Sequence, residues 1–298
     1  VKSVANDSEN ALSNDEKTKS SDTNKEVLTK TNEEEKESLL EEVSENTEEN
    51  TDELDEKEAL TDRWSVSPNI APVYFNTLSS GSSIHSQFNN NSKSGDINMS
   101  YGVSAAYAIN DKLSIRAGIN KVNLGYSTND IVVYNNIATP SEENPLKNIA
   151  FNETGQSMSF ISAQEFAFGQ VPGVLLHQIK GSIDQELGFI EVPLEVSYKL
   201  SDKKMSLSVI GGFSALFLDN NEVYSVLDGQ STLLGKATNI NKTSYSANLG
   251  LGLDFKLSEK FNLNLEPTFK YQLNTFNNTS GNFKPYFIGI YSGLKFKF

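Results

Sequence analysis

The chain lacks the residues on which many catalytic and metal sites depend. Its 298 residues include no cysteine and only two histidines, His85 and His177. Disulfide bonds and thiolate ligands are therefore excluded, and a histidine-based metal site has little material. We expect no metal site, no cofactor and no catalytic residue.

Long apolar runs are also missing. No stretch of about 18 apolar residues occurs, so the sequence predicts no transmembrane helix. No signal peptide is visible and the first residue is Val1, which is typical of a mature or truncated chain. The location of the protein must therefore be inferred from the pattern of the remaining residues.

Net negative charge is confined to the first fifth of the chain. Residues 1–62 hold 7 Lys against 21 Asp and Glu and no aromatic residue, whereas residues 63–298 are neutral, with 18 cations and 18 anions. Such a segment buries too little apolar surface to offset its ordering entropy, so we expect a disordered acidic leader. A segment that folds on a periplasmic partner is the alternative. The neutral remainder offers no basic surface for nucleic acid.

The last thirteen residues, 286–298, alternate in character. Every second residue forms a largely apolar face: Tyr286, Ile288, Ile290, Ser292, Leu294, Phe296 and Phe298. The intervening set is small, aromatic or cationic: Phe287, Gly289, Tyr291, Gly293, Lys295 and Lys297. A period of two predicts one strand with two unlike faces.

Seven earlier segments show the same alternation, so the sequence predicts eight strands. They are residues 64–76, 97–109, 113–126, 189–200, 205–217, 245–257 and 261–273. In the third segment the apolar residues change phase after Ile119, which predicts a β-bulge near Asn120 and Lys121.

The connections between these segments alternate in length. Three are tight polar turns at residues 110–112, 201–203 and 258–260, and the others span about 20, 60, 25 and 10 residues. Short turns at one end and long loops at the other are typical of outer-membrane barrels, with turns in the periplasm and loops outside the cell.

A soluble lipocalin-like barrel is the alternative, and side-chain volume decides against it. An eight-stranded barrel has a narrow interior, which suits the small and polar face of these strands. The bulky face then contacts lipid. Aromatic residues near the strand ends predict two girdles, at Tyr74, Tyr126, Tyr245, Tyr271 and Tyr286 and at Trp64, Phe255, Phe261 and Phe298.

Two stretches carry a resemblance to known proteins. Residues 293–298 resemble the C-terminal assembly signal of outer-membrane proteins, in which Gly293, Phe296 and Phe298 match a glycine followed by alternating hydrophobic residues that end in Phe. Residues 189–194 and 64–134 resemble small eight-stranded barrels of Bacteroidota, of the OmpA/OmpX-like type. The resemblance implies recognition by the barrel-assembly machinery.

Charged residues on the small face predict an internal network. It comprises Arg116, Glu191, Glu195, Lys199, Asp254, Glu266, Lys270 and Lys295, with Lys256 and Lys297 near the turns. Arg116, Glu195 and Glu266 fall at comparable depth. Because buried charges must be paired, we expect salt bridges that fill a closed lumen. A narrow ion-conducting pore is the alternative.

Two further features remain open. A lipid-modifying enzyme is disfavoured because His85 and His177 lie in long loops without a spaced acidic partner. The second long loop, residues 127–186, is too apolar for a solvated loop, with Phe160, Ile161, Phe166, Phe168, Val171, Val174, Leu175 and Leu176. We expect it to fold back as a cap or to extend the barrel wall as extra strands; a ligand- or protein-binding patch is the alternative.

The sequence therefore predicts an all-β protein, an eight-stranded antiparallel up-and-down transmembrane β-barrel preceded by a disordered acidic segment. Residues 1–62 form the predicted periplasmic leader and residues 63–298 the barrel in the bilayer of the outer membrane. We expect a structural, anchoring or ligand- and partner-binding role through the long outer loops, and no enzymatic activity.

Overall fold

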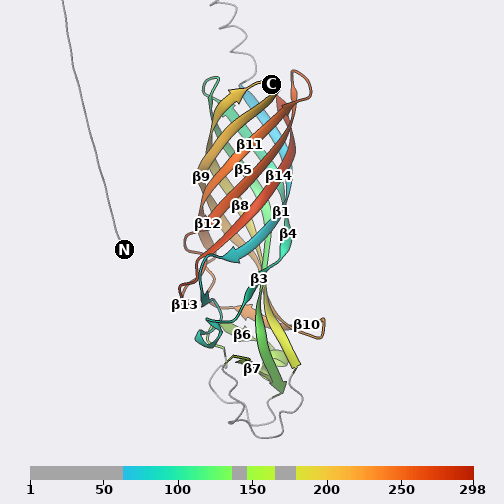
Figure 1. Cartoon of the computed structure of the whole chain (residues 1–298), viewed down its shortest axis with the longest axis vertical. Coiled ribbons are helices and arrows are strands. Elements are labelled where there is room, and N and C mark those ends of the chain that lie inside the picture. Colours follow the sequence, from blue (N-terminus) through green and yellow to red (C-terminus); the bar gives the residue numbers. More distant parts are fainter. Residues whose placement is uncertain (1–62, 136–145, 165–178) are drawn as a thin grey trace, which may run out of the picture. The chain divides into compact units, whose positions relative to one another are not determined.

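A ring of antiparallel strands forms the body of the protein. The computed structural model describes residues 63–135, 146–164 and 179–298. Eight strands close the ring: β1 (Trp64–Thr77), β4 (Ile97–Ala108), β5 (Leu113–Asn135), β8 (Ile179–Asp202), β9 (Met205–Leu227), β11 (Thr243–Lys256), β12 (Phe261–Gln272) and β14 (Pro285–Lys297). The order around the ring follows the chain, and β14 pairs with β1 to close it (Figure 1). The predicted eight-stranded up-and-down barrel is confirmed.

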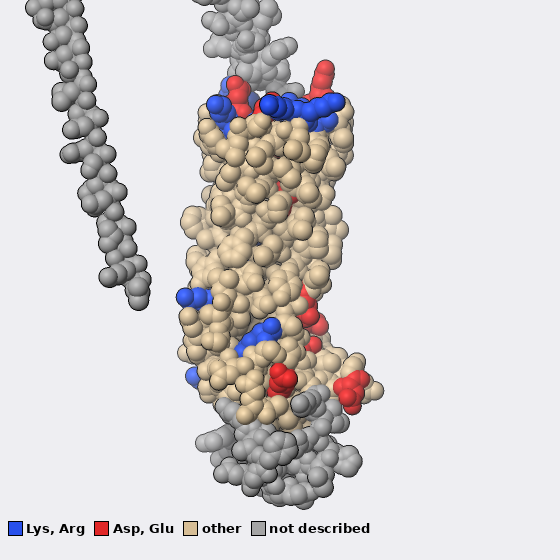
Figure 2. Space-filling view, viewed as in Figure 1, with Lys and Arg blue, Asp and Glu red and all other residues tan. Residues whose placement is uncertain are grey.

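Alternation along the strands separates an outer wall from the lumen. The bulky apolar set points outward and is exposed, as Ile97, Phe213 and Leu249 illustrate. Figure 2 shows the result as a wide band that is almost free of charged side chains, between the charged short-turn rim and scattered charges beyond the band. This inverted pattern, apolar outside and polar within, is that of a barrel with lipid around it. No helix in the described ranges is long and apolar enough to cross a membrane.

Two sequence predictions about β5 were wrong, and for one reason. The pairing of β5 with β8 runs without a shift from Asn120↔Glu191 to Thr128↔Ile183, so no bulge interrupts it at Asn120 and Lys121. The register shifts only between Thr128 and Ile131. Val122, Leu124 and Tyr126 therefore point into the barrel and are buried. Tyr126 belongs to the interior and not to an aromatic girdle.

Three strands continue beyond the barrel and build a second layer of structure. β5, β8 and β9 are 23, 24 and 23 residues long, whereas the other ring strands have 12 to 14. Their ends pair with the short strands β3 (Lys93–Gly95), β7 (Met158–Ser162) and β10 (Gln230–Ala237), and β10 pairs in turn with β6 (Ile149–Phe151). We call this part, at the long-loop end of the barrel, the extension (Figure 1).

The extension has a hydrophobic core of its own. Its buried members come from all the strands involved except β3 and include Ile131, Phe160, Ile183, Val223 and Leu234. Phe151 of β6 stacks on Phe160 of β7 with ring centroids 5.8 Å apart. The apolar residues of the second long loop that the structure describes, Phe160 and Ile161, thus form part of a strand. Phe166, Phe168, Val171, Val174, Leu175 and Leu176 lie outside the described residues.

The first loop packs into the extension. Ile84 and Phe88, the latter in the short helix η1 (Ser86–Phe88), are buried in the core of the extension. The adjoining strand β2 (Gly81–Ser82) pairs with β13 (Ser280–Gly281) of the last loop. Of the two arrangements expected for residues 127–186, the described part of that stretch takes the extra strands, which lengthen the barrel wall.

Candidate functional site

The lumen of the barrel collects most of the buried polar side chains, and three layers divide it. From the short-turn end, they are a layer around Arg116, a layer around Lys270 and an apolar layer. All three layers are built from side chains on the inward faces of the ring strands. The layers follow from the sequence, because inward residues change from polar to apolar along β1, β5, β8 and β14, whereas the inward residues of β11 and β12 stay polar.

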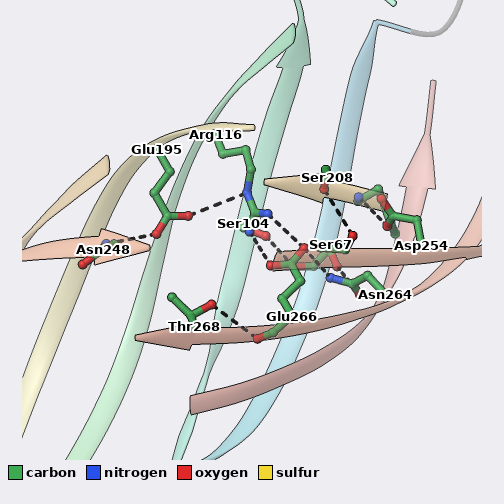
Figure 3. Close-up of polar contacts among 12 residues, drawn as sticks. Ser67, Ser104, Arg116, Glu195, Ser208, Asn248, Asp254, Asn264, Glu266 and Thr268 are labelled. Carbon is green, nitrogen blue, oxygen red and sulfur yellow. Dashed lines mark hydrogen bonds and ion pairs between the residues drawn. The ribbon is translucent and has the colours of Figure 1, made fainter. Parts of the chain in front are cut away.

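Arg116 of β5 joins two carboxylates across the lumen (Figure 3). Its Nη1 and Nη2 donate to Oε1 and Oε2 of Glu266, at 2.9 and 2.7 Å, in a two-pronged contact. Its Nε lies 3.8 Å from Oε2 of Glu195. Asn264 donates to Glu266 and Asn248 to Glu195, at 3.1 and 3.0 Å. The planar guanidinium suits this geometry because it presents paired donors to a carboxylate.

Lys270 of β12 and Glu191 of β8 form the second layer. Their side chains are 3% and 0% exposed, and Lys270 Nζ donates to Glu191 Oε1. Ser214 and Asn120 also donate to Glu191, at 2.6 and 3.4 Å. The ammonium lies 4.9 Å from the centre of the Tyr291 ring, a favourable cation–π distance. This pair is therefore removed from water and held on several sides.

An apolar layer follows toward the long loops. It includes Phe75, Tyr126, Phe189, Leu216 and Phe287, each at most 2% exposed. The Phe75 and Tyr126 rings lie 5.3 Å apart. Beyond it, Ser83 of the first loop contacts both Tyr126 and Gln185. Asn148 and Asn239 each donate to the Ser83 carbonyl at 2.8 Å, which ties three loop segments together.

The free space in the lumen falls steeply between the layers. A cavity of about 490 Å³ opens at the short-turn end and is lined by Arg63, Lys112, Lys256 and Lys297 among others. The next cavity, beside Arg116, Glu195, Lys270 and Tyr291, measures about 30 Å³. That volume holds one or two water molecules. Beyond it, the side chains of the apolar layer are packed together and almost fully buried.

The remaining lumen charges proposed from sequence lie nearer the short-turn rim. Lys295 pairs with Asp254 at 2.6 Å, and Lys199 pairs with Asp202 at 3.0 Å. The structure thus brings Arg116, Glu195 and Glu266 together and joins Glu191 to Lys270. Sequence reasoning missed Asn120, Ser214, Asn248 and Asn264, although all four lie on the inward faces that the alternation marks.

A comparison with protein families agrees with this architecture. The sequence model of the family described as "Outer membrane protein beta-barrel domain" matches residues 52–280. The chain belongs to this family. Its β-barrel therefore lies in the outer membrane. No curated protein matches the sequence.

Small outer-membrane barrels are among the similar solved structures. Neisserial surface protein A is 11% identical, with 79% of this chain and 97% of that chain covered and a TM-score of 0.37. The attachment invasion locus protein Ail of Yersinia pestis is 11% identical, with 80% and 100% covered and a TM-score of 0.34. OprG from Pseudomonas aeruginosa is 11% identical, with 80% and 96% covered and a TM-score of 0.40. Similarity at this level carries no information about function.

One of the two histidines, His85, lies in the part of this outer-membrane barrel that the structure describes. His85 precedes η1, and its Nδ1 accepts a hydrogen bond from the Gln87 amide at 3.2 Å. His177 lies outside the described residues. No group of three or more His, Asp or Glu side chains that could hold a metal ion occurs within the described ranges.

The residues proposed as an assembly signal lie where β14 meets β1 and β12. Phe296 and Phe298 point outward, with ring centroids 5.9 Å apart, and Phe261 of β12 lies 5.1 Å from Phe296. Gly293 of β14 lies so close to β1 that an added Cβ would be 2.3 Å from the Pro68 carbonyl oxygen. Glycine at this position is therefore a requirement of barrel closure.

One lysine outside the membrane-spanning wall is held by backbone carbonyls. Lys93 of β3 donates from Nζ to the carbonyl oxygens of Phe88, Asn89 and Asn91, at 2.6, 3.1 and 2.9 Å. Burial lowers the pKa of Lys93 from 10.5 to about 8. The three contacts tie η1 and its flanking loop to β3.

Proposed function

We propose that this protein is a sealed anchor in the outer membrane, which holds a folded extension outside the cell for contact with a ligand, a surface or a partner protein. The observation that carries the proposal is the separate hydrophobic core of the extension, built from Ile131, Phe160, Ile183, Val223 and Leu234. A loop that served only to join two strands would not need such a core.

The blocked lumen supports an anchor over a narrow pore. An ion crossing the barrel would have to pass the buried pair of Lys270 and Glu191 and then the apolar layer around Phe75 and Tyr126. Apolar constrictions exclude water and so oppose conduction. The lumen charges of the first two layers then act as internal braces between opposite strands.

The orientation follows from the connections. Tight turns join β4 to β5, β8 to β9 and β11 to β12, all at one end of the barrel. In outer-membrane barrels such turns lie in the periplasm and the long loops lie outside. We infer that the acidic leader, residues 1–62, lies in the periplasm, where it is available to a partner.

Biogenesis and origin are part of the same proposal. The terminal residues Gly293, Phe296 and Phe298 are proposed to be read by the barrel-assembly machinery. The resemblance of residues 189–194 and 64–134 favours a small barrel of Bacteroidota, of the OmpA/OmpX-like type. We propose no enzymatic activity, since His85 serves as a helix cap and the buried carboxylates Glu191 and Glu266 are paired with cations.

Single cysteines test the orientation and the exposure of the extension. Because the native chain has no cysteine, Ser231→Cys on β10 and Lys203→Cys in a short turn each give one thiol on an exposed residue. A maleimide that cannot cross membranes should label Ser231→Cys on intact cells and Lys203→Cys only after lysis. The reverse labelling order would refute the proposed orientation.

A further inference from the structure

The cavity at the short-turn end of the lumen, which we call the mouth, has more cations than anions. Seven Lys and Arg side chains and four carboxylates line its volume of about 490 Å³. The mouth lies on the solvent side of the Arg116 layer, so it is separate from the sealed part of the lumen. An inference about it is therefore independent of the proposed anchoring role.

Three of the four carboxylates of the mouth are already engaged by other cations, and the fourth, Asp111, is exposed in the turn between β4 and β5. Asp202 contacts both Lys199 and Lys256, at 3.0 and 2.9 Å. Asp254 contacts Lys295 at 2.6 Å. Glu266, at the floor, holds Arg116 at 2.7 Å. Three carboxylates are thus paired with four cations, which leaves little negative charge for the other cations of the mouth.

Lys297 is left without a carboxylate among the residues that the structure describes. It lies on the inward face of β14, is partly buried, and experiences repulsion from Lys199, Lys295 and Lys256. The one carboxylate that attracts it, Asp254, is already paired with Lys295. A partly buried ammonium among like charges is unfavourable unless an anion completes its surroundings. The mouth therefore lacks an anion beside Lys297, on the wall of the cavity that β14 forms.

Hydroxyl groups add neutral hydrogen-bond donors to the same cavity. Ser65 of β1 and Ser206 and Ser208 of β9 point inward beside these lysines and line the mouth. Lysine as a point charge and serine as a donor are a common combination for phosphate oxygens. The volume exceeds that of a single phosphate and admits a diphosphate.

We propose that the mouth binds a small, free phosphate-bearing anion through Lys297, with Lys199, Lys256 and Lys295 around it. The occupant is free and not a membrane lipid, because the mouth opens inside the ring of strands. Lipid contacts the opposite face, where Trp64, Leu257 and Phe298 lie exposed at the same end of the barrel.

Calorimetry of the full-length protein in zwitterionic nanodiscs, with inorganic pyrophosphate as the probe, tests the proposal. We expect binding that Lys297→Met weakens about tenfold, as loss of a charge-assisted contact would. Lys204→Met is the matched control, since Lys204 is exposed on the same rim but does not line the cavity; it should change the affinity less than twofold. Lys297→Gln serves as a second variant if Lys297→Met fails to insert.

Backbone NMR signals give an independent location for the ligand. Pyrophosphate should shift the amide signals of Ser206 and Ser208, which lie inside the cavity. The proposal is overturned if wild-type protein binds no pyrophosphate at millimolar concentration. Equal loss in Lys204→Met and Lys297→Met would also overturn it, because binding would then reflect the general charge of the rim. A shift of the Ser206 and Ser208 signals by anionic lipid alone would assign the mouth to a headgroup instead and likewise refute the proposal.

Discussion

Lys270 and Glu191 form an ion pair across the lumen, from β12 to β8, with side chains only 3% and 0% exposed. The two strands are not neighbours in the ring, so the pair braces the barrel across its interior. It also marks the level at which polar lumen gives way to apolar lumen, since Tyr291 and Phe287 lie beside the ammonium. The pair therefore links two strands that no backbone ladder joins directly.

Removing one member of this pair should destabilise the barrel strongly. Lys270→Met leaves Glu191 buried and uncompensated, which costs about 3–5 kcal/mol for a buried pair. Unfolding in urea from lipid vesicles, followed by the fluorescence of the single tryptophan Trp64, measures the loss. The double variant Lys270→Met/Glu191→Leu should recover part of that loss.

An exposed ion pair provides the control. Lys199 and Asp202 are 34% and 45% exposed, so Lys199→Met should cost less than about 1 kcal/mol. If Lys270→Met were as mild as Lys199→Met, the buried pair would not brace the barrel.

The second prediction is that a side chain at Gly293 disturbs closure of the ring. An added Cβ would lie 2.3 Å from the Pro68 carbonyl oxygen, a backbone atom of β1, so Gly293→Ala must disturb the β14–β1 pairing. Gly211→Ala is the matched control, because its nearest atom would lie 3.9 Å away. We expect a clear fall in the yield of the heat-modifiable folded form for Gly293→Ala alone. Equal yields would mean that β14 and β1 are not so closely apposed.

Much of the barrel could be predicted from sequence because the period of two is strong in each ring strand. The exposed face was assigned correctly from side-chain volume, as Leu249 and Phe213 show. The phase of β14 was also right, with Phe287 and Tyr291 inward and Ile288 and Ile290 outward. Local alternation carries this information without any knowledge of neighbouring strands.

The errors came where the lumen changes character. A single polar-inside rule made Val122, Leu124 and Tyr126 look like outward residues after a bulge, although the strand continues in register. Only the neighbouring inward residues, such as Phe75 and Phe189, reveal an apolar layer. The pairings of the extension depend on contacts distant in sequence, such as Gly235↔Phe151, and alternation within one segment does not encode them.

The C-terminal residues give a third prediction. Deletion of residues 296–298 should lower the amount of protein inserted in the outer membrane, because the proposed assembly signal ends at Phe298. Quantitative blotting of separated membranes measures this. The Phe261→Ala variant, which removes the aromatic partner of Phe296 but keeps the terminus, controls for lost packing. Normal insertion of the deleted chain would exclude the signal function.

The burial of Lys93 predicts how the stability of its loop depends on pH. Burial lowers the pKa of Lys93 to about 8 from 10.5. Between those values the unfolded chain binds more protons than the folded chain, so this loop becomes more stable as the pH rises from about 8 to 10.5. Carbon-13 NMR of the lysine ε-carbons should show a midpoint near pH 8 for Lys93. A midpoint near the ordinary value of 10.5 would contradict the burial of this amine.

The central claim, that the lumen is sealed, is tested most directly by conductance across a planar lipid bilayer. We predict no single-channel current for the wild-type protein or for Arg116→Ala, because the Lys270–Glu191 pair and the apolar layer remain in both. Insertion is verified in the same preparations by the heat-dependent shift in gel mobility. Steady ion-selective channels from the inserted wild-type protein would contradict the account and establish a pore.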